Sequence, residues 1–306
     1  MASVLSDPRF HDEEAAYRYV EARIWPDGPV CPRCGSCDRI GKLKGKSTRI
    51  NTYKCYECRK PFTVKVGTIF EASKVPMHIW LQAIHLLCAG KKGVSANELG
   101  RILGVQVRTA WFMAHRIREA MRPTKHPKIG GGGKSVEADE TFFGRKKDKR
   151  KRRGYGHKHA VLALIERGGK VQSHHVPNVK ASTLKPILHG QIRHDSMLMT
   201  DEAGQYRPLG KRFEKHFAVN HGAGEYVRGG AHTNTLENYF SIFKRGMNGV
   251  YQHCSQRHLR RYLAEFDFRY NERGVSDTMR AEAALIGAIG KRLKYMDSSG
   301  RAAGMQ

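Results

Sequence analysis

The sequence predicts an α/β domain in its second half, preceded by a small metal-binding module and a helical region. Residues 29–70 contain two Cys-x-x-Cys pairs, and residues 77–122 repeat apolar side chains at helical spacing. Residues 135–275 alternate between strand patterns and helix patterns, which is typical of α/β proteins.

Length and charge narrow the class of protein. The 306 residues suit about two domains, and 40% hydrophobic residues exclude a chain that is disordered throughout. The 55 Lys and Arg against 28 Asp and Glu give a net charge of +27, for which a membrane surface and a polyanion such as a nucleic acid are both candidate partners. We favour DNA or RNA because the charge is spread along the chain and no basic amphipathic anchor stands out. The sequence has neither a long apolar run nor a secretory signal pattern, so we expect no membrane partner.

Residues 1–28 predict a short helical lead, and residues 29–70 predict a zinc ribbon. The seven cysteines are odd in number, and four of them form two Cys-x-x-Cys pairs, which indicates metal binding in a reducing cytosol. Two such pairs suit a tetrahedral Zn²⁺ ion that closes a loop too small to fold alone. The expected ligands are Cys31, Cys34, Cys55 and Cys58. Cys37 is an alternative to Cys34, although that exchange loses the pair spacing.

Residues 77–122 predict a helix-turn-helix. The Ser95–Glu98 segment fits a helix-capping box, and Gly104 ends that helix. The next helix carries Arg108 and Arg116, which we expect to contact DNA from the major groove. The alternative is an ordinary helical hairpin, and the net charge favours the DNA-binding interpretation.

A Pro- and Gly-rich stretch over residues 123–134 predicts a flexible linker and the main domain boundary. Beyond it, five segments have strand patterns: Ser135–Phe143, His159–Ile165, Lys170–Val176, Met197–Thr200 and His216–Val219. Helices are predicted at Asn234–Arg245 and Gln256–Tyr270, and residues 276–306 are expected to form a C-terminal tail.

A run of eight cations in nine residues, Arg145–Arg153, predicts a solvated loop because like charges repel. It is either a solubilising loop or a phosphate-binding arm beside the first strand of the α/β domain. For the second interpretation the DNA-binding candidates are Lys146, Lys147, Arg150, Lys151 and Arg152.

Three acidic residues stand out against this basic background. Asp139 lies in the first predicted strand, Asp201 ends an apolar strand, and Glu237 lies near a helix start. Each alone is commonly a surface or capping carboxylate, but carboxylates on neighbouring elements of an α/β core can converge on Mg²⁺. Two such ions activate a water or a 3′-OH for phosphodiester transfer. Lys244 is two helical turns after Glu237 on the same face, where it can hold a DNA phosphate.

Several short motifs together resemble the zinc-ribbon insertion-sequence transposases of the ISXO type over nearly the whole chain. The ribbon region contributes Trp25-Pro26-Asp27-Gly28, Cys31-Pro32-Arg33-Cys34-Gly35 and Lys65-Val66-Gly67-Thr68-Ile69-Phe70. The later region contributes Asp139-Glu140-Thr141, Thr200-Asp201-Glu202, Val219-Asn220-His221, His232-Thr233-Asn234-Thr235-Leu236-Glu237 and the run Phe243–Tyr251, which contains Lys244 and Arg245.

This resemblance implies a ribonuclease-H-like catalytic domain with a DDE triad. Asp139 then corresponds to the first-strand acid, Asp201 to the fourth-strand acid and Glu237 to the helical acid. The implied activity is binding of terminal inverted repeats, followed by cleavage and strand transfer with Mg²⁺, or with Mn²⁺ in its place. Lys244 and Arg245 are then candidate contacts to double-stranded DNA.

Partners and compartment follow from the same resemblance. Synapsis of two element ends makes a homo-oligomer the expected assembly, in a prokaryotic cytoplasm and associated with the nucleoid. Two alternatives remain. One is a non-catalytic DNA-binding regulator that uses the ribbon and the helix-turn-helix, and the other is a nuclease of the same fold without strand transfer.

Overall fold

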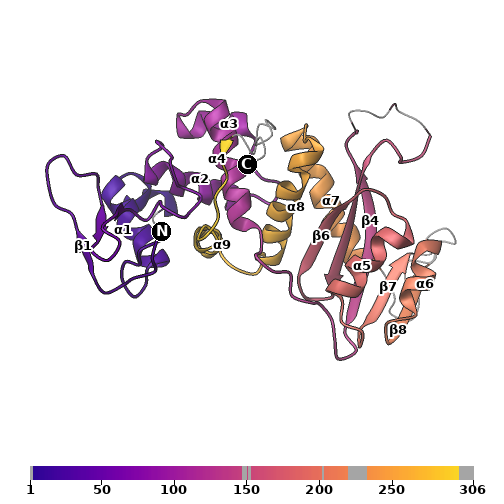
Figure 1. Cartoon of the computed structure of the whole chain (residues 1–306). Helices are drawn as coiled ribbons and strands as arrows, with labels where there is room; N and C mark the ends of the chain where they lie inside the picture. The colour runs from indigo at the N-terminus through magenta and orange to yellow at the C-terminus, as the bar shows by residue number, and fades with distance from the viewer. Residues whose placement is uncertain (1–2, 147–149, 151–152, 202, 220–232, 296–306) are drawn as a thin grey trace. The chain divides into compact units, whose positions relative to one another are not determined.

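The computed structural model describes residues 3–146, 150, 153–201, 203–219 and 233–295, and it divides the chain into two compact units (Figure 1). The first unit comprises Met1–Arg122 together with Val275–Gln306, and the second comprises Pro123–Gly274. The first boundary therefore lies where the predicted linker begins. Within the described ranges, no helix combines the length and the apolar character needed to cross a membrane.

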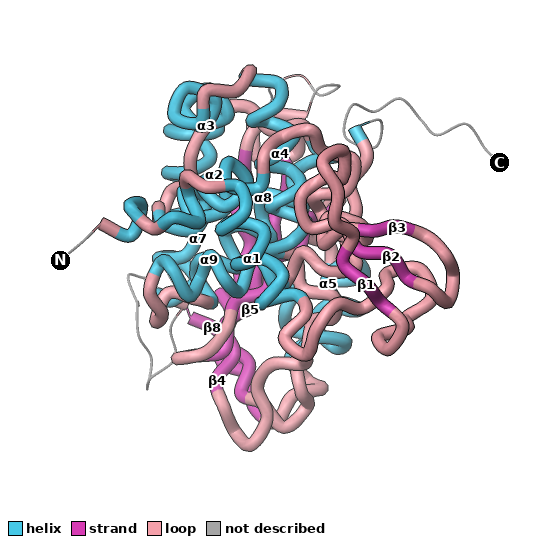
Figure 2. Tube along the Cα trace, turned by 90° about the vertical axis from the view of Figure 1, so that its left-hand side faces the viewer, coloured by secondary structure: helices cyan, strands magenta, loops and turns pink. Residues whose placement is uncertain are grey.

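The first unit begins with short 3₁₀ turns at Val4–Ser6 and Pro8–Phe10, followed by helix α1 (Glu13–Ile24). Three antiparallel strands follow in the order β1 (Ile40–Lys42), β2 (Tyr53–Cys55) and β3 (Pro61–Phe62), which Figure 2 shows side by side as a small sheet. The remaining helices are α2 (Met77–Ala89), α3 (Ala96–Leu103), α4 (Val107–Met121) and α9 (Asp277–Ile286).

Helices α3 and α4 are joined by a tight turn. The Ser95 hydroxyl caps α3 by accepting a hydrogen bond from the Glu98 amide at 3.1 Å. Gly104 ends the helix with a left-handed backbone (φ 64°), which glycine adopts without a steric penalty. Both helix signals in the sequence are therefore present as predicted, and α4 starts three residues later.

Helix α9 corrects the prediction that residues 276–306 form a tail. Ser276 caps this helix, Ala284 and Leu285 are buried, and the helix packs against α2. Arg280 is buried at the contact and donates a hydrogen bond to the Cys88 carbonyl at 2.8 Å. Residues 296–306 of the predicted tail lie outside the described residues.

The second unit contains a five-stranded sheet in the order β6-β5-β4-β7-β8. The strands are β4 (Ser135–Phe143), β5 (His159–Glu166), β6 (Val171–Val176), β7 (Met197–Asp201) and β8 (Lys215–Val219). β4, β5 and β6 form an antiparallel meander, whereas β7 runs parallel to both β4 and β8. Each predicted strand agrees with the structure to within one residue at either end.

Helices cover both faces of this sheet. Val136 and Ala138 of β4 pack in one cluster with Leu184 and Leu188 of α5 (Ala181–Gln191), and the short helix α6 (Arg207–Gly210) adds Leu209. On the other face, β5 packs against α7 (Asn234–Gly246) and α8 (Gln256–Asn271). Helix α7 continues directly into a π-helical turn, Met247–Tyr251. The odd-numbered side chains of β4 therefore face α7 and the even-numbered ones face α5.

The predicted flexible linker is also corrected. Ile129 is buried and bridges to Ile192, and the four glycines Gly130–Gly133 have positive φ values. The amides of Gly130, Gly131 and Gly132 donate hydrogen bonds to the side chains of Glu166, Ser196 and Asp195, at 2.9, 2.8 and 2.7 Å. This segment belongs to the second unit because its hydrogen bonds offset the entropy that glycines lose on ordering.

A buried carboxyl group joins β6 to α7 and α8 in the second unit. Asp267 accepts hydrogen bonds from the Tyr239 and Ser173 hydroxyls at 2.6 and 2.7 Å, and from the Ser173 amide at 2.8 Å. Burial raises the pKa of Asp267 from 3.8 to about 6, against the lowering effect of these hydrogen bonds.

This raised pKa predicts a pH-dependent stability. Because the folded state binds the Asp267 proton more tightly than the unfolded state does, its contribution is fully present below pH 3.8 and is lost as the pH rises through about 6. An asparagine at this position would not titrate, so Asp267→Asn should lack this loss. Between pH 4 and pH 7 we expect the unfolding free energy of Asp267→Asn to rise relative to that of the parent protein by up to about 3 kcal/mol. Urea unfolding across this range measures the difference in unfolding free energy between the two proteins. A difference that does not change with pH would contradict the prediction.

Candidate functional site

Four cysteines form a cluster in the first unit. The sulfur atoms of Cys31, Cys34, Cys55 and Cys58 all lie within 4.8 Å of one another, with Cys31–Cys58 at 3.7 Å and Cys34–Cys55 at 3.6 Å. Among the residues that the structure describes, this is the only group of three or more His, Cys, Asp or Glu side chains gathered so closely. Four thiolates in this arrangement match the ligand set of a structural Zn²⁺ ion.

The surroundings of the cluster suit thiolate ligands. Cys31 and Cys55 are buried, and Phe62 of β3 packs beside them. Burial acts to raise the pKa of Cys31, but hydrogen bonds from the backbone of Arg33 and Cys34, together with those to the Cys34 and Cys58 side chains, outweigh it and lower that pKa to about 7. The alternative ligand Cys37 lies outside the cluster, with its sulfur 3.7 Å from an Asp38 oxygen.

The strand acids lie on adjacent parallel strands. In the β4–β7 pair, Glu137 is opposite Met199, and Asp139 and Asp201 each come two residues later in their strands. Side-chain alternation therefore puts both acids on the sheet face that α7 covers. Their proximity is also visible at Glu140: burial chiefly, together with the charges of Asp139 and Asp201, raises the pKa of Glu140 to about 7.

Glu137 fastens α7 to β4. Its fully buried carboxylate accepts hydrogen bonds from the Thr235 hydroxyl at 2.8 Å and the Leu236 amide at 3.1 Å, both in the first turn of the helix. Arg167 donates to the same carboxylate at 3.0 Å, so the buried charge is paired. Glu137 is not among the residues predicted to be functional. The local sign of its role is an acidic side chain within a mostly buried strand.

Glu237 lies in the first turn of α7, one residue after Leu236, and its side chain is exposed. The structure thus brings Asp139 and Asp201 onto neighbouring strands and attaches the helix of Glu237 to the same sheet face. The three carboxylates are not gathered as closely as the four cysteine sulfurs. The motif residues Glu202, Asn220, His221 and His232 lie outside the described residues.

The predicted DNA-contacting cations of the second unit differ in their surroundings. Lys244 is exposed on α7 and lines a cavity at the end of β4, whereas the exposed Arg245 is hydrogen bonded to the Ser241 hydroxyl of its own helix at 2.9 Å. Lys146 is half-buried and Arg150 is exposed. Lys147, Lys151 and Arg152 lie outside the described residues.

Arg116 is wrong as a DNA contact. Its side chain is buried, donates to the Ile69 carbonyl at 2.8 Å and the Leu293 carbonyl at 3.2 Å, and lies over the Phe112 ring. Burial lowers its pKa, and its role is to pair backbone carbonyls inside the first unit. Arg108, near the start of α4, is exposed as a groove contact requires.

Comparisons with known proteins match both units. The family described as the ISXO2-like transposase domain matches residues 130–271, and the transposase zinc-ribbon domain matches residues 11–61. A protein in transposable element ISH50 of Halobacterium salinarum is 28% identical over 281 residues, covering 85% of this chain and 91% of the relative. A transposase-like protein of Haemophilus influenzae is 30% identical over 120 residues, covering 38% of this chain and 94% of the relative.

Proposed function

The chain belongs to the family of ISXO2-like transposases, and on that premise we propose that it binds the terminal inverted repeats of an insertion sequence and catalyses Mg²⁺-dependent cleavage and strand transfer. The observation that carries the proposal is the parallel β4–β7 pair, which aligns Asp139 and Asp201 on one sheet face. The strand order β6-β5-β4-β7-β8, with α7 across that face, supports a ribonuclease-H-like catalytic domain.

In this proposal Asp139, Asp201 and Glu237 are the ligands of the catalytic Mg²⁺ ions. Hard carboxylate oxygens suit Mg²⁺. The negative charges of Asp139 and Asp201, which add to the effect of burial in raising the pKa of Glu140, are a reason for a cation to bind beside them. The bound ions supply activation of a water or 3′-OH and stabilisation of the leaving oxygen. Glu137 keeps the first turn of α7 against β4. Lys244, which lies on the same helix, binds a DNA phosphate.

The first unit serves DNA binding in this account. The zinc ribbon, with structural Zn²⁺ on its four cysteines, and the α3–α4 pair, acting as a helix-turn-helix, would hold the element ends. Joining two ends to one target requires two copies of the active site, so we infer a homo-oligomer at synapsis.

Arg108 and Arg116 form a matched pair that tests the role of α4. We expect Arg108→Ala to leave the unfolding free energy within about 0.5 kcal/mol and to reduce the salt dependence of DNA binding by about one phosphate contact. Arg116→Ala leaves two buried carbonyls unpaired and should cost about 2–4 kcal/mol of stability. Chemical unfolding and salt-titrated DNA binding measure both effects. A loss of stability in Arg108→Ala, or a reduced salt dependence of DNA binding in a stable Arg116→Ala, would contradict the role given to α4.

One assay separates the candidate activities. The full chain is incubated with a labelled element end, Mg²⁺ and a plasmid target. Joined product supports the transposase. Nicking without joining supports a nuclease of the same fold, and binding without any cleavage supports a DNA-binding regulator; either of these would overturn the proposal.

A further inference from the structure

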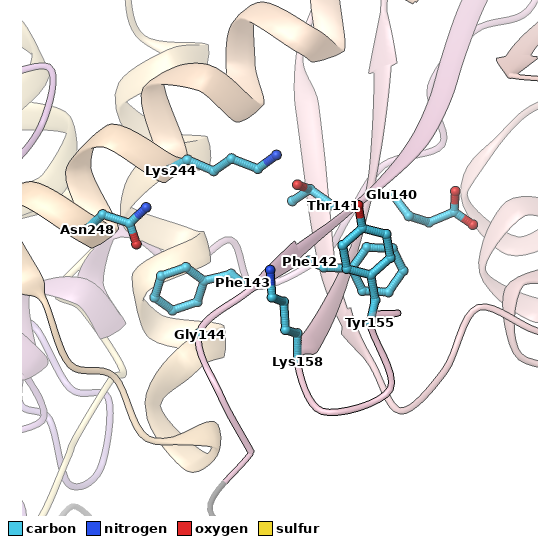
Figure 3. Close-up of a pocket in the computed structure, with 9 residues that line it drawn as sticks. All are labelled: Glu140, Thr141, Phe142, Phe143, Gly144, Tyr155, Lys158, Lys244 and Asn248. Carbon is cyan, nitrogen blue, oxygen red and sulfur yellow. The ribbon is translucent and has the colours of Figure 1, made fainter. Parts of the chain in front are cut away.

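A cavity of about 590 Å³ surrounds the carboxyl end of β4 (Figure 3). Phe142 of β4, Tyr155 and Lys158 from the segment before β5, and Lys244 and Asn248 from α7 and its π-helical end all line it. Nothing in the proposed chemistry of the three acids requires this cavity. Its volume and its mixture of aromatic and cationic groups suit a ligand that has both an aromatic ring and a negative charge.

The aromatic part of the cavity is a stack with an open end. The rings of Phe142 and Tyr155 are nearly parallel, with centroids 4.5 Å apart and an interplanar angle of 8°. Tyr155 is 58% exposed, whereas Phe142 is partly buried against the sheet core. A flat aromatic ligand can therefore extend the stack from the solvent side, as unpaired bases do on exposed aromatic side chains.

The cationic part of the cavity lies beside this stack. Figure 3 shows the amines of Lys158 and Lys244 pointing into the same space, while the carboxylate of Glu140 points away from them. The Lys158 amine is 5.3 Å from the centroid of the Tyr155 ring. Within the described part of the chain, neither amine has a carboxylate partner. Two such ammonium groups suit a phosphate, and the exposed Asn248 amide offers both a donor and an acceptor to a base edge.

We propose that this cavity binds a single unpaired nucleotide at a DNA end, with its base stacked on Tyr155 and its phosphate between Lys158 and Lys244. The inference rests on the proposed function, because residues that line the cavity lie close in sequence to two of the candidate metal ligands. Glu140 directly follows Asp139 in β4, and Lys244 is two turns after Glu237 in α7. A nucleotide held there places the adjoining phosphodiester bond near the acids.

The test compares two duplexes that differ in one base. Each carries a single-nucleotide overhang, which is 2-aminopurine in one duplex and abasic in the other, and binding to the full chain is measured without added Mg²⁺. We expect about tenfold tighter binding of the 2-aminopurine duplex, a gain of about 1.4 kcal/mol, together with quenching of its fluorescence. Tyr155→Ala should abolish both effects, whereas Tyr155→Phe should keep them.

The controls assign the effect to this cavity. Tyr295→Ala, which removes an exposed tyrosine outside the cavity and outside the zinc ribbon, should keep the tenfold preference. Lys158→Ala should weaken binding of both duplexes to the same extent. Equal binding of the two duplexes by the parent protein, or an unchanged preference in Tyr155→Ala, would overturn the inference. Because no step here needs cleavage, a failure of the proposed function appears separately, as absent strand transfer with the base preference intact.

Discussion

Asp139→Asn and Asp201→Asn are each expected to reduce DNA cleavage and strand transfer by about 10³-fold or more, while DNA binding is retained. Asp139 and Asp201 each lie two residues beyond the paired Glu137 and Met199, so each substitution removes one negative charge from the same face of the sheet. A catalytic metal contributes several kcal/mol of transition-state stabilisation, and about 4 kcal/mol corresponds to about 10³ in rate. The loss should appear equally in cleavage and in joining, because one site serves both steps. Quantified gel assays of both products measure it.

The matched control is Glu214→Gln, which changes the charge of an exposed acid in the same unit and should leave both rates near those of the parent protein. Glu237→Gln is expected to behave like the two aspartate variants. Full activity in either aspartate variant, with folding intact by circular dichroism, would contradict the assignment of the catalytic ligands.

Cys55→Ser is expected to release zinc and to unfold the ribbon. Binding of the element ends should be lost as a result. Cys55 is fully buried at the end of β2, and its sulfur lies 3.6 Å from that of Cys34. The small β1–β3 sheet has few buried apolar residues of its own, so the metal supplies most of its folding free energy. Structural zinc contributes about 10–16 kcal/mol in comparable small modules, which this sheet cannot replace. Metal analysis, together with limited proteolysis of residues 29–70, measures both losses.

Cys37→Ser is the matched control, because this cysteine lies six residues from Cys31 but outside the cluster. It should retain the zinc content and protease resistance of the parent protein. Zinc retained in Cys55→Ser, or lost in Cys37→Ser, would show that the ligand set is wrong.

Local patterns in the sequence were sufficient for the strands of the second unit. Alternating side chains predicted Ser135–Phe143 with the bounds that the structure gives, because the two faces of the strand have different partners. Val136 and Ala138 pack in the apolar core, and Glu137 faces α7. The helix cap at Ser95 and the helix end at Gly104 were also predicted from the sequence, because both depend on interactions within a few residues. The cysteine cluster was predicted from the spacing alone, because the ligand requirement of zinc fixes that spacing.

The errors concern partners that are distant in sequence. Arg116 looked like a groove contact because its two acceptors, the Ile69 and Leu293 carbonyls, are 47 and 177 residues away. Arg280 similarly draws α9 into the first unit through the Cys88 carbonyl. Four consecutive glycines indicated flexibility, because ordering glycines costs much conformational entropy. The composition of the segment does not show that distant side chains accept hydrogen bonds from the glycine amides. Glu137 was overlooked as an anchor because its helix lies about 100 residues further along the chain.

The proposed catalysis requires that the acids of β4, β7 and α7 share divalent cations. Anomalous scattering from crystals soaked in Mn²⁺ tests it without reference to activity. We expect a peak between β4 and β7, within about 2.0–2.5 Å of carboxylate oxygens of both Asp139 and Asp201. A structure with Mn²⁺ bound elsewhere and these two carboxylates free of metal would contradict it.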